Sequence, residues 1–198
     1  PAEGRLTALW AKALVFEDPQ GYQLAVVTLD LVGIDRPTSL AVRQELCRKH
    51  GWELSQLALF TSHTHTGPVV GHNLGAMYFL DDAQWKQVDD YTARLKKAIV
   101  AVVDAAVKDL EPCELSWGIG RTDFAVNRRE NPESKVPELR TAGQLKGPVD
   151  HDVPVLRVGR ASSGPQPGTN ALKAVVFGYA CHATVLSFYQ WSGDYPGF

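Results

Sequence analysis

The chain has few cysteines and no paired cysteine motif. Its 198 residues include three cysteines, Cys47, Cys113 and Cys181, and no two of them form a Cys-x-x-Cys pair. An odd number of scattered cysteines argues against a small secreted domain that is held together by disulfides. Cysteine usage therefore leaves the cellular compartment open.

The sequence also lacks a charge imbalance and a long apolar run. Lys and Arg number 20, Asp and Glu number 22, and the formal net charge is -2. This balance gives no reason to expect nucleic acid or an anionic membrane surface as a partner. No run approaches the ~18 apolar residues that a membrane-spanning helix needs, and residues 1–5 lack the pattern of a signal peptide.

The composition is that of an ordinary globular protein, with 44% hydrophobic and 21% charged residues. A chain of this length can bury one good core, which corresponds to about one domain or one and a half. Residues 6–17 start abruptly with strand character, and residues 191–198 end in a Gly- and Pro-containing loop. We therefore expect a segment of a longer protein, incomplete at both ends.

The first half predicts alternating strands and helices. Apolar strands are expected over 6–17 and 22–32, joined by a turn, and the second is apolar on both faces, as in a central strand covered by helices. A helix is expected from residues 35–37 to Gly51, before a strand over 57–61. Short connections predict a right-handed crossover and a parallel pair.

The second half predicts one more long helix and three strands. The helix runs from Asp81 or Asp82 to about Lys108, and the strands cover 113–120, 152–158 and 171–180, the last two as an antiparallel hairpin. Pro154 favours an edge position for its strand. Residues 121–149 are expected to be a loop without structure of its own. The fold class is therefore α/β, a mixed sheet with covering helices.

Two histidines follow the strand over 57–61. His63 and His65 are spaced i, i+2, which on a strand places both side chains on one side, roughly 6 to 7 Å apart at Cα. Neutral imidazole is a common metal ligand and carries protons near neutral pH. The pair therefore suits a metal or acid–base site. The alternative is a pair that caps the strand by hydrogen bonding.

Asp30 and His182 end two further predicted strands. Ligand groups in open α/β sheets gather at the carboxyl ends of strands, so we expect these residues near His63 and His65. Asp30 would be an acid, a metal ligand or a carboxylate that orients a histidine, or a carboxylate satisfied by loop amides. Cys181 next to His182 is not expected to act as a thiol–base pair, because adjacent strand residues point to opposite faces.

The long polar stretch contains Arg128 and Arg129. Two adjacent arginines could bind an anionic or carbonyl-bearing group. The alternative is a solvated surface pair, since surface charges usually contribute little.

Residues 61–68, Thr-Ser-His-Thr-His-Thr-Gly-Pro, resemble the Gly-Thr-His-Thr-His-Ser-Gly-Pro motif of the neutral/alkaline (non-lysosomal) ceramidase family. Three other segments fall in the family's order: Leu29–Val32, Asn127–Arg128, and Tyr179–His182 followed by Ser192–Tyr195. The resemblance covers nearly the whole chain but only the front part of the family's catalytic domain.

The resemblance implies a zinc-dependent amidase that hydrolyses the N-acyl bond of ceramide to sphingoid base and fatty acid. His63 and His182 would be zinc ligands, and His65 would polarise the substrate or stabilise the oxyanion. Arg128 would hold polar substrate groups or support that charge. Zinc suits this chemistry because it polarises a carbonyl and activates water. A lipid substrate further implies peripheral membrane contact, and the family allows a secreted or periplasmic location.

The family completes its zinc shell with a glutamate and a tyrosine that would lie beyond Phe198, so activity of this chain alone is not implied. Arg129-Glu130 stands where the family has Ser-Pro, and Val69-Val70 replaces Gly-Gly. Both changes line the expected pocket and leave ceramide itself open as the substrate.

Two other functions remain open. A metal-dependent phosphoesterase would use Asp30, His63, His65 and His182 with a second metal about 3.5 to 4 Å away. A non-catalytic lipid- or carbohydrate-binding module would use the histidines structurally.

Overall fold

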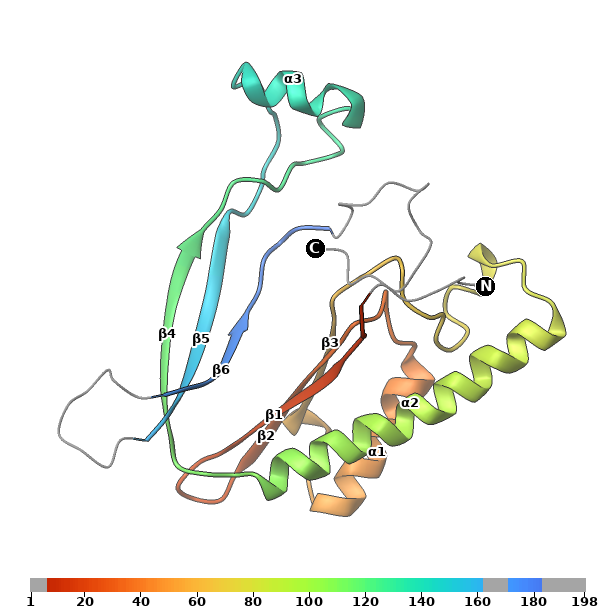
Figure 1. Cartoon of the computed structure of the whole chain (residues 1–198), viewed down its shortest axis with the longest axis vertical. Coiled ribbons are helices and arrows are strands. Elements are labelled where there is room, and N and C mark those ends of the chain that lie inside the picture. Colours follow the sequence, from red (N-terminus) through yellow and green to blue (C-terminus); the bar gives the residue numbers. More distant parts are fainter. Residues whose placement is uncertain (1–6, 162–170, 183–198) are drawn as a thin grey trace. The chain divides into compact units, whose positions relative to one another are not determined.

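The computed structural model describes residues 7–161 and 171–182 (Figure 1). They form two compact units, one within residues 1–110 and one within residues 111–182, each with its own three-stranded sheet. The α/β class is confirmed, whereas the single mixed sheet expected from the sequence is replaced by two small sheets. None of the helices in these residues is long and apolar enough to cross a membrane.

The sheet of the first unit has the order β1-β2-β3 and is mixed. Strand β1 (Ala11–Glu17) runs antiparallel to β2 (Gln23–Leu29), which runs parallel to β3 (Leu57–Thr61). The β1–β2 turn is held by the Asp18 carboxylate, which accepts hydrogen bonds from the backbone N–H groups of Gln20 and Tyr22. The predicted parallel pair is therefore confirmed.

Helix α1 (Arg36–His50) begins and ends at the predicted residues. The Asp35 carboxylate accepts a hydrogen bond from the Thr38 N–H and caps the first turn. Gly51 ends the helix in the left-handed conformation, with φ of 71°, which glycine adopts without steric cost. A short 3-10 turn, η1 (Leu54–Gln56), then leads into β3.

Helix α2 (Asp82–Lys108) is capped at Asp81 by a reciprocal pair of hydrogen bonds with Gln84. It follows the loop that contains the short 3-10 turn η2 (Gly75–Met77). Helix α2 packs against α1 and β1, so that both helices enclose the core of the unit (Figure 1).

The core of the first unit lies between the sheet and these helices. Strand β2 buries Ala25, Val27 and Leu29, whereas Leu24 and Thr28 on its other face are exposed. The expectation that β2 is covered on both faces is therefore wrong for the described residues. The remaining fully buried side chains come mainly from the two helices: Val42, Leu46, Ile99 and Val103.

The sheet of the second unit is antiparallel throughout, with β4 (Cys113–Arg121), β5 (Asp152–Arg160) and β6 (Leu172–Phe177) in this order. The predicted hairpin of the last two strands is confirmed. However, β5 is the central strand, so the edge position inferred from Pro154 is wrong. The Pro154 carbonyl accepts from the Gly178 N–H, just past the last paired residue of β6, Phe177. The missing N–H of proline therefore falls where that ladder ends.

Residues 121–149 are structured, contrary to the expectation from sequence. They contain the 3-10 turn η3 (Glu133–Lys135) and the short helix α3 (Val136–Thr141). Asn131, which is 1% exposed, donates to the carbonyls of Asn127 and Lys146 and accepts from the Lys146 N–H. Asn127 donates to the Pro148 carbonyl. These side chains replace the backbone ladder that the segment lacks.

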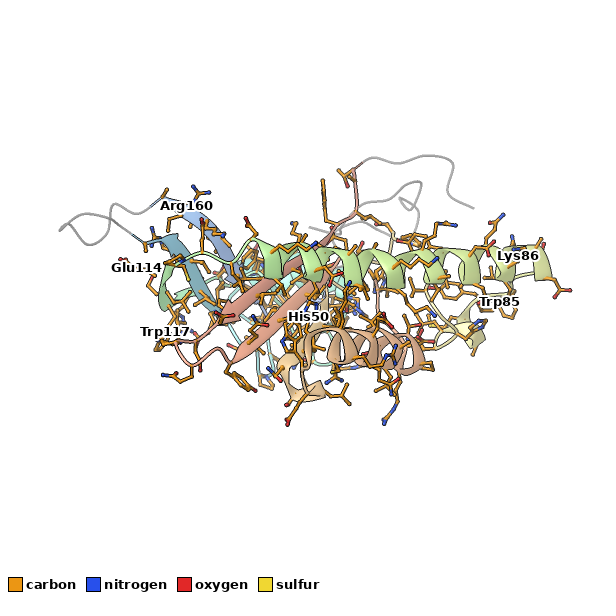
Figure 2. The ribbon with its side chains drawn as sticks, turned by 90° about the horizontal axis from the view of Figure 1, so that it is seen from below. His50, Trp85, Lys86, Glu114, Trp117 and Arg160 are labelled. Atoms are coloured by element: carbon orange, nitrogen blue, oxygen red, sulfur yellow. The ribbon has the colours of Figure 1, made fainter. Side chains whose placement is uncertain are left out.

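A polar contact joins the ends of α1 and α2 in the first unit. The Asp104 carboxylate on α2 bonds His50 Nε2 at 2.9 Å and pairs with Lys49. His50, marked in Figure 2, stacks on Trp52 with ring centroids 4.6 Å apart. Burial raises the pKa of Asp104, but hydrogen bonds from Lys49 and His50 outweigh it and hold this pKa below its ordinary value.

We expect Asp104→Asn to lower the free energy of unfolding by roughly 1 kcal/mol at pH 7. A carboxyl group whose pKa is lowered by folding stabilises the protein above its unfolded pKa of about 4, and this contribution is lost as pH falls further. The difference from wild type should therefore shrink at pH 3. Urea unfolding at both pH values measures it. Asp90→Asn, in an exposed pair with Lys86 on the same helix, is the control and should change stability less.

Candidate metal centre

His63 lies on an unusual backbone turn beyond the end of β3. The strand ends at Thr61, and the Ser62 N–H still donates to the Leu29 carbonyl at 3.0 Å. His63 then has φ of 59°, the left-handed region that few residues other than glycine adopt. Strand pleating was the predicted reason for His63 and His65 to lie on one side. This reason is wrong, because both residues lie beyond the end of the strand. The turn brings their rings together instead, with centroids 5.0 Å apart and planes at 77°.

A backbone carbonyl fixes the orientation of the His63 ring. Its Nδ1 lies 2.6 Å from the Val32 carbonyl oxygen. A carbonyl oxygen only accepts hydrogen bonds, so Nδ1 must carry the proton in this contact. In the neutral ring the lone pair is then on Nε2, the atom suited to bind a metal ion.

The residue between the two histidines points into the protein. Thr64 is fully buried, and its hydroxyl bonds the Thr66 hydroxyl at 3.2 Å and the Thr66 N–H at 3.4 Å. His63 is exposed and His65 is half-buried. The buried threonine thus anchors the turn while the two imidazoles remain near the surface.

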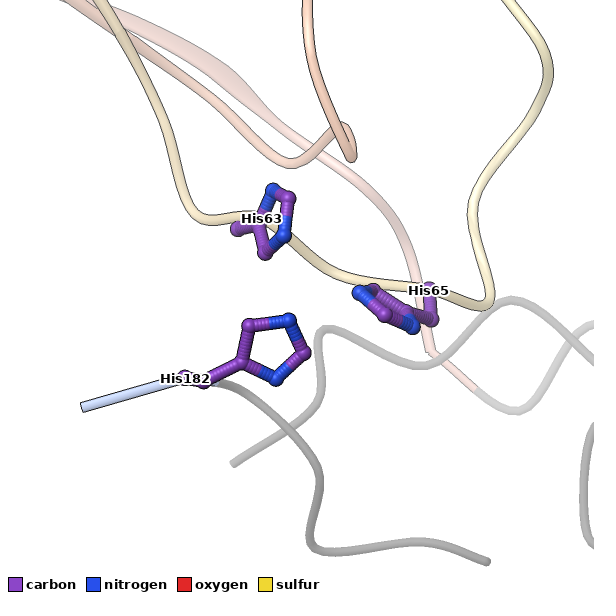
Figure 3. A group of neighbouring side chains, drawn as sticks. All are labelled: His63, His65 and His182. Carbon is purple, nitrogen blue, oxygen red and sulfur yellow. The ribbon is translucent and has the colours of Figure 1, made fainter. Parts of the chain in front are cut away.

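His182 follows β6 and is the last residue of the second unit. His63, His65 and His182 each offer one ring nitrogen within 4.8 Å of the others (Figure 3). In the described part of the chain, these three residues form a group that could hold a metal ion.

Asp30 directly follows β2, as predicted, but is not a member of this histidine group. Its carboxylate accepts a hydrogen bond from the Trp10 backbone N–H at 2.9 Å. Asp30 also lines a pocket of about 220 Å³ together with Tyr91 and Arg94 of α2. A role for Asp30 as ligand or as a group that orients a histidine stays a prediction.

Arg128 lies in the second unit, in a turn that Asn127 organises. The Asn127 side-chain oxygen accepts from the N–H groups of Arg129 and Glu130 at 3.0 and 3.2 Å. Arg128 is exposed, and no hydrogen bond or ion pair joins its guanidinium to another residue in the ranges that the structure describes. A role in substrate binding stays a prediction as well.

His72 and Cys181, two further side chains that could bind a metal or react, are accounted for by their surroundings. His72 bonds the Asp89 carboxylate at 2.8 Å and stacks on Trp85, with centroids 4.8 Å apart. Burial raises the pKa of the Cys181 thiol, which disfavours the thiolate that a cysteine nucleophile needs. The segment Ser192–Tyr195, part of the family resemblance, lies outside the described residues.

The comparison with known families decides the affiliation of the chain. The model of the neutral/alkaline non-lysosomal ceramidase family, N-terminal part, matches residues 1–192. The chain belongs to this family. The resemblance seen in the His-Thr-His-Thr-Gly-Pro motif is thereby confirmed.

Solved ceramidase structures share the fold of this family member. Neutral ceramidase from Pseudomonas aeruginosa matches with a TM-score of 0.70 and 24% identity, over 98% of this chain and 29% of that one. A ceramidase complexed with C2 matches with a TM-score of 0.69 and 23% identity, over 95% and 28% of the two chains. The chain thus spans less than a third of the length of either structure.

Sequence reasoning missed the residues of this ceramidase-family chain that support the histidines. Val32 acts through its carbonyl, which no side-chain pattern reveals. Thr64 lies inside the motif and Asp35 at the start of a predicted helix, and neither position indicates a contact with the segment around the histidines. All five residues from 61 to 65 are polar, so no hydropathy pattern distinguishes the buried Thr64 from the two histidines beside it.

The left-handed backbone at His63 predicts how this position responds to mutation. His63→Asn and His63→Val both remove the bond to Val32, but asparagine tolerates this backbone and β-branched valine does not. We expect the valine variant to be less stable than the asparagine variant by about 1–3 kcal/mol. Urea unfolding without added metal measures the difference. Equal stabilities would mean that the backbone at residue 63 is not constrained.

Proposed function

We propose that this chain forms part of a zinc-dependent amidohydrolase site that cleaves the N-acyl bond of a ceramide-like lipid to a sphingoid base and a fatty acid. The observation that carries the proposal is the grouping of three imidazole nitrogens within 4.8 Å in a ceramidase-family chain. Because the chain covers less than a third of the ceramidase structures it matches, the proposed activity is that of the whole protein.

His63 and His182 are the proposed zinc ligands. Zinc binds imidazole nitrogen at about 2.0–2.1 Å, so two ligand nitrogens on one ion are at most about 4.2 Å apart. The three histidines each offer one ring nitrogen to such a site. The Val32 carbonyl, by holding the proton on His63 Nδ1, presents Nε2 for binding. The donor set therefore fits zinc, and further ligands would come from elsewhere in the protein.

When bound, zinc would polarise the amide carbonyl and lower the pKa of a bound water towards ~7. His65 would act beside the ion. Its ring centroid lies 5.0 Å from that of His63, and in this role an N–H of His65 would donate to the carbonyl oxygen as negative charge develops there. Preorganised donors of this kind contribute strongly to the stabilisation of the transition state in acyl transfer.

Arg128 is proposed to hold polar groups of the substrate. Arg128 is exposed, and the turn that carries it is fixed by hydrogen bonds that the side chains of Asn127 and Asn131 donate and accept. A planar guanidinium on a fixed turn can bind carbonyl or hydroxyl oxygens without much loss of backbone freedom. The solved ceramidase with C2 supports a lipid amide as the class of substrate, which the protein would meet by peripheral contact with a membrane.

The proposal predicts a graded loss of metal. In the longest natural polypeptide that contains these residues, elemental analysis should find about one zinc per chain. His63→Ala and His182→Ala should each remove most of it, whereas His65→Ala should reduce zinc affinity much less. His72→Ala is the matched control, since this exposed histidine of the same loop lies outside the group. Equal loss in the His65 variant would contradict the assigned roles.

The reaction class is tested with paired substrates. Release of fatty acid from an N-acyl sphingoid base, absent in the zinc-free protein and restored by zinc, is the expected result. Hydrolysis of a phosphate ester instead would support the phosphoesterase alternative. Binding of lipid with no turnover of either substrate would support a non-catalytic module.

Arg128→Ala should lower kcat/KM at least about tenfold while zinc content stays at the wild-type level, because the guanidinium contacts substrate and not metal. Arg160→Ala is the control, because this exposed arginine at the end of β5 pairs with Glu111, and it should leave the kinetics within twofold. Steady-state kinetics on the N-acyl substrate measures both. Unchanged kinetics in the Arg128 variant would return this residue to the class of solvated surface charges.

A further inference from the structure

The connection between β2 and α1, residues 30–35, borders the loop that carries the two histidines. We define this histidine loop as residues 62–72. The connection meets it at the Asp30 carbonyl, which would lie 3.3 Å from a Cβ placed on Gly67, and at the Val32 carbonyl, which bonds His63. A third contact, made by Asp35, lies at the far end of the loop. One short segment therefore supports the loop along its whole length.

Asp35 divides its two carboxylate oxygens between a helix and the histidine loop. Oδ1 accepts from the Thr38 N–H at 3.0 Å, which caps α1, and Oδ2 accepts from the His72 N–H at 3.2 Å. The residue is only 8% exposed. Burial raises its pKa, but the hydrogen bonds from Thr38 and His72 prevail and keep this pKa below its ordinary value. The group is therefore an anion at neutral pH.

The loop residue before His72 is closely fitted to this carboxylate. Gly71 has φ of +61°, and a Cβ placed there would lie 2.3 Å from Asp35 Oδ2. The Gly71 N–H donates to the Thr92 hydroxyl at 3.0 Å, and this hydroxyl in turn donates to the Val88 carbonyl on α2 at 2.7 Å. The far end of the loop is thus fixed between Asp35 and α2.

A cap for α1 would need only one of these oxygens. Asp81 caps α2 in the same way, through the Gln84 N–H. It is exposed, and within the described residues its hydrogen bonds are to Gln84 and Trp85, not to the histidine loop. A simple helix cap would explain neither the hydrogen bond to the second oxygen of Asp35, nor the burial of this residue, nor the close fit of Gly71 against it. They indicate a further role directed at the loop.

We propose that Asp35 is a positioning residue of the candidate metal centre. It fixes the far end of the histidine loop while Val32 fixes the near end, so that His63 and His65 hold one arrangement before an ion binds. This inference deepens the proposed function and rests on it for the identity of the metal. Support of ligands by outlying hydrogen bonds commonly changes metal affinity 10- to 100-fold.

Asp35→Asn separates the two roles of the residue. Asparagine is as good a helix cap as aspartate. However, Thr38 and His72 bond different oxygens of Asp35, and asparagine replaces one of these oxygens with an NH2 group, which cannot accept from an N–H. Asp81→Asn is the matched control, because it makes the same chemical change at the cap of α2. Asp35→Asn should lose more thermal stability than Asp81→Asn, because it leaves a partly buried N–H without its acceptor, whereas Asp81 is exposed.

Two measurements on the longest natural polypeptide compare these variants. Amide hydrogen exchange in the metal-free protein reports directly on residues 62–72. Competition with a chelator gives the affinity for Zn²⁺ alone. For Asp35→Asn we expect faster exchange across the histidine loop and a loss of zinc affinity of about tenfold or more. For Asp81→Asn we expect wild-type values in both.

A glycine pair gives a second route that leaves Asp35 in place. Gly71→Ala introduces a methyl group against the Asp35 carboxylate, whereas Gly51→Ala introduces one at a similar φ with nothing within 4 Å. Both variants are destabilised by left-handed backbone strain. Only the Gly71 variant should accelerate amide hydrogen exchange in the histidine loop and weaken zinc binding.

The outcomes separate this inference from the proposed function. Wild-type exchange across residues 62–72 in Asp35→Asn, with stability changed as in Asp81→Asn, would overturn the positioning role whatever the zinc result. A wild-type protein that binds no zinc would overturn the proposed function, while the exchange data would still decide the role of Asp35. Faster exchange together with unchanged zinc affinity would overturn the link between the loop and the metal.

Discussion

The bond from His63 to the Val32 carbonyl is the contact on which the arrangement of the histidines depends. It holds a residue in a left-handed conformation that costs free energy, and it fixes the nitrogen on which the proton sits. The bond can form because β2 and β3 are parallel neighbours, which brings the chain beyond Leu29 next to the chain beyond Thr61. The sheet therefore determines the chemistry of a residue that is not part of it.

The same relation extends to the support of the histidine loop. Segments that leave the two strands run together, and Asp35 lies where the first of them becomes a helix. One carboxylate can then stabilise both the start of α1 and the far end of the loop. Folding of the helix and ordering of the loop are coupled through this single buried anion, and a metal ion would find its first ligand already oriented.

Features with local causes could be predicted from the sequence. The bounds of α1 follow from Asp35 and Gly51, and the family motif brought out His63 and His65. Features with distant causes could not. The left-handed turn at His63 depends on Val32, 31 residues away. The order of residues 121–149, and the division into two sheets, depend on side-chain contacts and strand pairings between segments far apart in sequence, which periodicity does not encode.

The backbone turn at His63 also limits which mutations this position can accept over evolution. Among residues other than glycine, Asn, Asp and His adopt the left-handed conformation most readily. The codons of Asn and Asp each differ from those of His by one base. Single-base changes that keep this backbone conformation therefore replace His63 with side chains that offer oxygen ligands. Such ligands suit Mg²⁺ and Mn²⁺ better than softer ions. For the metal ligand proposed here, a single dihedral angle thus limits which side chains, and with them which metals, the position can accept.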